Sequence, residues 1–263
     1  FSVQNKKMVL LVEIRIPLPI SVNDYHIAQL YAVAEESKRN TGGGEGVQVI
    51  KNEPFEKEGV EGQYTYKTYN VENKVPGWAR ALLPTGCLLF KEHAWNSYPN
   101  CRTEYSNEYL SNRFKILIES KHLPDNGSSE NPFNLSNDQL KQRRVVELNI
   151  CDASSLDPSV ISEKWDPTIV KSEKVCTLPL SKDFAQVANP IMCCYKLYTI
   201  IFKIPLLGSS VENKVLSSTQ NFLLDFHRKL VCYIDQWTGM TLEELREHER
   251  NTEEELKLKI NEL

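Results

Sequence analysis

Residues 192–204 have the sequence MCCYKLYTIIFKI, which is typical of a long β-strand because β-branched and aromatic side chains are abundant in it. The period of the sequence then changes. Between residues 209 and 237 apolar side chains recur every three or four positions, which indicates a long helix. Thr241 and Glu244 form a capping-box pattern that opens a final helix over residues 241–263. The chain therefore ends with a strand followed by long helices.

One helix and several strands precede this stretch. Ser21 and Asp24 mark the start of the helix, and the glycine-rich residues 41–46 end it rather than form a phosphate-binding loop. Strand-like stretches cover residues 9–17, 46–53, 62–72, 86–95, 101–109, 113–122 and 144–151. Because these strands follow one another without intervening helices, we expect a mainly antiparallel sheet. The fold class is therefore α+β, and a sheet that curls around a helix would enclose a cavity.

The composition is that of a globular protein with a nearly neutral body. The 263 residues include 31 Lys and Arg against 35 Asp and Glu, with 41% hydrophobic and 25% charged residues. Residues 241–263 carry 8 acidic and 4 basic side chains, so this segment accounts for the whole acidic excess. A neutral body lacks the basic stripe of nucleic-acid-binding proteins, so we expect no nucleic-acid partner.

The sequence also lacks the motifs of several enzyme and metal-site classes. It contains no Gly-x-Ser-x-Gly, no His-Glu-x-x-His and no Cys-x-x-Cys, although it has seven cysteines. We therefore expect no catalysis, no metal and no cofactor, and reduced thiols as in cytosolic proteins. Residues 1–7 precede Met8 and are interpreted as a leader or a cloning remnant, which leaves residues 8–263 as a single domain.

Four polar residues occupy positions that the periodicity assigns to apolar faces. Glu249 lies on the apolar stripe of the final helix, and Lys196 alternates with the apolar residues of the strand at 192–204. Thr65 and Lys67 share one face of an earlier strand. There is an alternative for each. The final helix could be exposed at Glu249, Lys196 could lie at a sheet edge, and Thr65 and Lys67 could belong to an ordinary solvated face. Together the four residues favour a polar patch at one end of an apolar interior, which suits an amphiphilic ligand.

A ligand with two acyl chains needs an enclosed site. Such chains carry on the order of 30 methylenes, each worth ~0.8 kcal/mol when removed from water, or roughly 25 kcal/mol in total. A carrier must therefore open only at a membrane. Ile204, Pro205, Leu206 and Leu207 lie between a strand and a helix, and four apolar residues in such a loop predict membrane contact. A loop packed on the core is the alternative.

These residues and their surroundings resemble the phosphatidylinositol transfer protein family over nearly all of residues 8–260. The motifs that carry the resemblance are TGGGEGV at 41–47, NEPF at 52–55, AWNSYP at 94–99, RT at 102–103, YKL at 195–197 and FHRKL at 226–230. The resemblance implies a START-like helix-grip fold, in which a concave sheet of about eight strands wraps long helices around one lipid. It also implies non-catalytic exchange of phosphatidylinositol for phosphatidylcholine between membranes.

Positions that match the family motifs imply roles for individual residues. The residues that match the inositol-ring contacts are Thr65, Lys67, Asn96 and Glu249. The residues that match the lipid-phosphate contacts are Gln29, Thr103, Ser120 and Lys196, with Ser120 in place of the family's threonine.

Four further positions correspond to features of the family outside the head-group contacts. Cys101 matches a cavity cysteine of the choline-binding branch. Ser172 matches a regulatory phosphorylation serine, although the residues after it differ from the family. The family's membrane-inserting tryptophan pair is replaced by Ile204 and Pro205, which keeps the loop apolar but loses the interfacial preference of indole.

The sequence therefore predicts a monomeric cytoplasmic lipid carrier that contacts membranes peripherally and transiently, with residues 241–263 as its gate. The alternative is a lipid sensor that presents phosphatidylinositol to lipid kinases with little net transfer. A lipid hydrolase would need a nucleophile and base pair, and the sequence shows none.

Overall fold

The computed structural model describes residues 9–40, 46–70, 86–202 and 208–261. Eight strands form one sheet in the order β2-β3-β4-β5-β6-β8-β1-β7. The strands are β1 (Val9–Leu18), β2 (Gly46–Lys57), β3 (Val60–Asn70), β4 (Leu89–Ser97), β5 (Asn100–Ser106), β6 (Phe114–Leu123), β7 (Arg144–Glu147) and β8 (Met192–Phe202). The predicted α+β class and the predicted sheet of about eight strands are confirmed.

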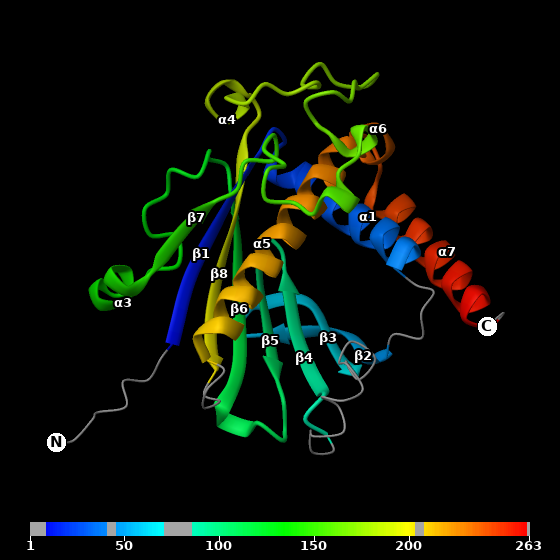
Figure 1. Ribbon diagram of the computed structural model, residues 1–263. Coiled ribbons are helices and arrows are strands. Elements are labelled where there is room, and N and C mark those ends of the chain that lie inside the picture. The colour runs from blue at the N-terminus through cyan, green and yellow to red at the C-terminus, as the bar shows by residue number, and fades with distance from the viewer. Residues whose placement is uncertain (1–8, 41–45, 71–85, 203–207, 262–263) are drawn as a thin grey trace.

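Every neighbouring pair in the sheet is antiparallel except β1 and β7, which are parallel. The predicted strand at 144–151 is shorter than expected, because pairing ends at Glu147. The predicted strand at 86–95 begins later, at Leu89, because Gly86 takes a positive φ of 85° in the preceding turn. In Figure 1 the strands β2 and β3 run across the direction of β1 and β8, so the sheet curves around the helix that packs on it.

The main helices are α1 (Val22–Asn40), α5 (Gly208–Cys232) and α7 (Leu242–Asn261), with α6 (Ile234–Trp237) between the last two. Figure 1 shows α5 across one face of the sheet and α1 beside α7 at one end of it. The backbone N–H of Asp24 donates to Ser21 Oγ at 3.1 Å, and that of Glu244 donates to Thr241 Oγ1 at 3.2 Å. Both predicted helix starts are therefore confirmed.

The first part of the long connection between β6 and β8 packs on the face of the sheet opposite α5, whereas Ile150 and Asp166, later in the same connection, contact α5. The connection contains α3 (Asn137–Gln142), β7, α4 (Phe184–Val187) and short 3-10 turns. The fully buried Glu13 of β1 forms ion pairs with Arg15 at 2.7 Å and with Arg143 at 2.6 Å. Arg15 also donates to the carbonyl of Gly127 at 2.7 Å. These contacts hold the segment that contains Gly127 and Arg143 against β1. That strand is therefore buried on both faces.

The FHRKL motif fixes α5 to its surroundings. Arg228 is only 3% exposed, donates to the carbonyl of Ile150 and lies 3.2 Å from the carboxylate of Asp166. Lys229 forms an ion pair with Glu36 of α1 at 3.0 Å. This part of the motif therefore serves the fold.

Replacing Arg228 with methionine should destabilise the protein by about 3 kcal/mol, because it leaves a partly buried carboxylate and a buried carbonyl without their partner. Urea unfolding followed by circular dichroism measures the change. Arg102→Met is the matched control, since the Arg102 side chain is 50% exposed and its loss should change the free energy of unfolding little. Equal urea midpoints for the two variants would contradict this interpretation.

Candidate functional site

Four of the predicted ligand-binding residues form one row across the sheet. In the strand register Asn96 of β4 is opposite Cys101 of β5, Cys101 is opposite Ser120 of β6, and Ser120 is opposite Lys196 of β8. Residues that are directly opposite each other point to the same face of a sheet. The Lys196 ammonium donates to Ser120 Oγ at 3.1 Å, which fixes it in this row. We call these four residues the polar row.

The other predicted strand residues lie on the same face. Thr65 of β3 is opposite Ala94, and Ala94 is opposite Thr103 of β5. Lys67, two residues from Thr65, is opposite Glu92. The predicted inositol and phosphate contacts from the strands therefore form neighbouring rows on one face, as the period-two pattern of Thr65 and Lys67 predicted.

The two predicted residues from helices are less closely joined to this face. Gln29 of α1 is half-buried, and the side chain of Glu249 in α7 is 29% exposed and forms an ion pair with Arg246 at 3.0 Å. Within the described residues, no hydrogen bond or ion pair links Gln29 or Glu249 to the polar row. Burial and the charge of Arg246 lower the pKa of His26, whereas the nearby Glu249 carboxylate opposes this change. Glu249 is therefore partly buried and close enough to His26 of α1 to affect its pKa.

An apolar groove lies between this face of the sheet and α5. Its volume is about 370 Å³, and Tyr105, Ile118 and Tyr198 line it from the strands. Val215 and Phe222 of α5 line its other side. The same face thus offers polar groups at the polar row and apolar surface beside it, which is the pattern that an amphiphile requires.

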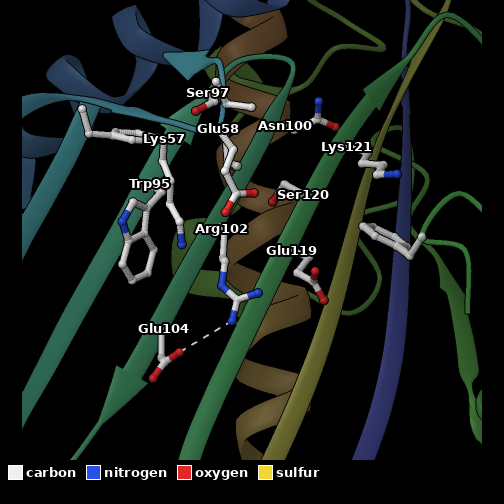
Figure 2. A pocket seen from close by; sticks show the side chains of 14 residues that line it. Lys57, Glu58, Trp95, Ser97, Asn100, Arg102, Glu104, Glu119, Ser120 and Lys121 are labelled. Atoms are coloured by element: carbon white, nitrogen blue, oxygen red, sulfur yellow. Dashed lines mark ion pairs between the residues drawn. The ribbon is translucent and has the colours of Figure 1, made fainter. Parts of the chain in front are cut away.

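A larger hollow of about 850 Å³ opens on the opposite face of the sheet, and Cys101 and Ser120 of the polar row also border it. Figure 2 shows its side chains Trp95, Arg102, Glu104 and Glu119 on the side of the strands away from α5. Charges of both signs line this hollow, and Arg102 lies 3.8 Å from Glu104. Burying acyl chains there would desolvate these charges, so the smaller apolar groove is the better lipid site despite its volume.

Sequence reasoning missed three polar residues on the same face as the polar row, namely Glu92, Tyr69 and Tyr105. Glu92 is 5% exposed, and it accepts hydrogen bonds from the hydroxyl groups of Tyr69 and Tyr105. Glu92 alternates with Ala94 and Asn96 along β4, so the period-two pattern could have identified it. Its neighbours Lys91 and His93 give the segment the appearance of a solvated strand, which concealed the signal.

The end of this face beyond Lys196 is closed by a buried hydrogen-bonded cluster. The Tyr25 hydroxyl lies 3.0 Å from His227 Nε2 and 3.6 Å from Cys194 Sγ. Burial and the neighbouring Cys194 raise the pKa of Tyr25, so its hydroxyl stays protonated and can donate. All three side chains are buried, and the cluster therefore joins α1, β8 and α5 as part of the core.

Ser172 lies in the connection between β7 and β8, where it contacts α6. Its hydroxyl donates to Asp235 of α6, and the backbone N–H groups of Glu173 and Lys174 donate to the same carboxylate at 2.9 and 3.2 Å. These donors lower the pKa of Asp235. The predicted membrane-contact residues 204–207 and the predicted leader at 1–7 lie outside the described residues.

Neither a membrane-spanning helix nor a group of metal ligands is found in the described segments. Their helices are too short or too polar to cross a bilayer. The same segments contain no group of three or more His, Cys, Asp and Glu side chains suited to a metal ion.

A curved, mainly antiparallel sheet with a polar row beside an apolar groove under a long helix is the arrangement of a START-like α+β fold. A family model for phosphatidylinositol transfer proteins matches residues 9–254. The chain therefore belongs to the phosphatidylinositol transfer protein family, a family of lipid-transfer proteins, and the predicted resemblance is confirmed.

Two relatives illustrate the match. The chain is 44% identical over 254 residues to the phosphatidylinositol transfer protein beta isoform of Homo sapiens. The match covers 95% of this chain and 94% of the relative. It is 40% identical over 252 residues to phosphatidylinositol transfer protein 1 of Dictyostelium discoideum, with 95% of each chain covered. Both relatives are named as transfer proteins rather than enzymes.

Proposed function

We propose that this protein carries one phospholipid at a time and exchanges phosphatidylinositol for phosphatidylcholine between membranes, without catalysis and without a cofactor. The observation that supports it best is Lys196, a half-buried ammonium that donates to Ser120 beside the apolar groove. Among the described residues no carboxylate forms an ion pair with Lys196. A lipid phosphate would supply the missing anion, and Thr103 and Ser120 would add hydroxyl donors.

The two lipids would share the phosphate contacts and differ at the head group. Thr65, Lys67 and Asn96 offer donors and acceptors to the hydroxyl groups of an inositol ring, with Glu249 as an acceptor from the gate. Cys101 in the polar row supports phosphatidylcholine as the second ligand, since it offers a small and weakly polar surface to a trimethylammonium group.

Helix α7 within residues 241–263 would act as the gate. Leu245 is fully buried, and the ring of His248 stacks on Tyr31 of α1 at 4.8 Å. His248 Nε2 also lies 3.1 Å from the carboxylate of Glu35. These contacts join α7 to α1 rather than to the sheet, which supports a helix that can leave α1 while the sheet stays intact. The carrier would be a cytoplasmic monomer that meets membranes peripherally and transiently, including through residues 204–207.

Two measurements test this proposal. Native mass spectrometry of the protein purified from cells should show one intact diacyl phospholipid per chain. Purified protein should also move fluorescent phosphatidylinositol and phosphatidylcholine from donor to acceptor vesicles when no kinase is present. A protein that binds phosphatidylinositol but transfers it only alongside a lipid kinase would instead be a lipid sensor, and hydrolysed lipid after long incubation would indicate an enzyme.

A further inference from the structure

Glu92 is a buried carboxylate on the face that carries the proposed lipid site. In the strand register it is opposite Lys67 of β3 and Tyr105 of β5. Tyr105 lines the apolar groove, so Glu92 borders the space between the sheet and α5. A carboxylate with 5% exposure is destabilising unless its oxygens find donors and its charge finds a partner.

The two oxygens of this carboxylate have different surroundings. Both tyrosine hydroxyl groups, from Tyr69 and Tyr105, donate to Oε2 at 2.6 Å. Burial, together with the Glu92 carboxylate, raises the pKa of each tyrosine, so both remain neutral donors. Lys67 Nζ lies 3.6 Å from Oε1, which is an ion pair without a hydrogen bond. Oε2 is therefore fixed by two donors, whereas Oε1 keeps capacity to accept beside the lysine ammonium.

We propose that Glu92 is a further specificity-determining residue of this site, in which Oε1 accepts a hydroxyl group of the inositol ring while Lys67 donates to an adjacent one. This inference rests on the proposed function. A sugar hydroxyl both donates and accepts, so a carboxylate and an ammonium side by side match two neighbouring hydroxyl groups. The trimethylammonium group of choline has no hydroxyl donor, and it gains nothing from Oε1. Glu92 and Lys67 thus act as one unit that distinguishes phosphatidylinositol from phosphatidylcholine.

The test is a double-mutant cycle on the full chain, with Glu92→Gln, Lys67→Met and the double variant. The probes are phosphatidylcholine vesicles that contain fluorescent phosphatidylinositol, and the same vesicles with fluorescent phosphatidylcholine instead. Each single variant should lose about tenfold in phosphatidylinositol affinity, because each loses a hydrogen bond to a charged group. The double variant should lose little more than Lys67→Met alone. Independent roles would instead multiply to about a hundredfold and would overturn the proposal.

Glu104→Gln is the matched control. Glu104 lies on β5 but on the opposite face, where it forms an ion pair with Lys115 at 2.8 Å, and its amide variant should keep both affinities. Urea unfolding of every variant separates a folding defect from a binding defect. If Glu92→Gln does not fold, Tyr69→Phe tests the same point, since it removes one donor to Oε2 and should lower phosphatidylinositol affinity alone.

The outcomes separate this inference from the proposed function. Wild-type protein that binds neither lipid would contradict the proposed function itself. Wild-type protein that binds both lipids, together with a Glu92→Gln variant that binds phosphatidylinositol normally, would overturn only the role of Glu92. Equal losses for both lipids in folded Glu92→Gln would show that the carboxylate shapes the site rather than reads the inositol ring.

Discussion

Replacing Lys196 with methionine should strongly weaken the binding and transfer of phosphatidylinositol and phosphatidylcholine alike. Both lipids carry the phosphate that we assign to Lys196, so the loss does not depend on the head group. Removing one partner of a desolvated, hydrogen-bonded charge pair costs about 3 kcal/mol, which corresponds to an affinity loss on the order of a hundredfold. Equilibrium binding to vesicles that contain either fluorescent lipid measures the loss.

The fold itself should tolerate the Lys196 substitution. In the described residues the ammonium has Ser120 as its hydrogen-bond partner and no carboxylate, so methionine removes a poorly neutralised charge from a partly buried position. Lys121→Met is the matched control, because Lys121 is the next residue after Ser120, lines the hollow on the opposite face and lies over the ring of Phe133 at 5.9 Å. Equal loss of lipid binding in both variants, or normal binding by Lys196→Met, would exclude the proposed phosphate site.

Replacing Leu245 with alanine should loosen α7 from α1. Leu245 is fully buried, and a Leu→Ala change at such a site typically costs 2–5 kcal/mol, or about 3 kcal/mol here. If α7 is the gate, this cost shifts its equilibrium between packed and detached states roughly a hundredfold toward detachment. We expect faster proteolysis within α7, faster loss of bound lipid, and a larger fraction of protein on vesicles. Limited proteolysis and vesicle sedimentation measure these changes.

Leu242 provides the control on the same helix. Leu242 is 50% exposed, so Leu242→Ala makes the same chemical change at an exposed position. This variant should behave as the wild type in proteolysis and sedimentation. A Leu245→Ala protein that is globally destabilised but shows no selective cleavage in α7 would indicate that the helix is part of a single cooperative unit and does not open separately.

Periodicity alone predicted most of the fold and part of the site. The alternation of Lys196 with Tyr198 and Ile200 placed all three on one face, and the register confirms that they face the same side as Ser120 and Ile118. The pairing of Thr65 with Lys67 was predicted in the same way. These predictions succeeded because a strand fixes which residues share a face regardless of what packs on it.

Other features depend on contacts between distant segments, which periodicity does not contain. The parallel pairing of the short β7 with β1 depends on how residues 124–143 cross the outer face of the sheet. Leu242 is exposed although it is an apolar residue of the predicted final helix, and burial on this helix begins at Leu245. For Glu249 the sequence allowed either a position on the inner face or an exposed one. The structure shows it half-buried and beside Arg246. The buried state of Glu92 follows from tyrosines on two other strands.

The polar row also has a consequence for how the molecule gains and loses its cargo. Its four residues come from four successive neighbours in the sheet, and the hydrogen bond from Lys196 to Ser120 joins positions 76 residues apart in the chain. The row exists only when these long-range pairings have formed, so no partly folded intermediate that lacks β8 can hold the phosphate. A bound phospholipid would then stabilise the pairing of these strands, and the lipid-bound protein would unfold at a higher temperature than the empty protein.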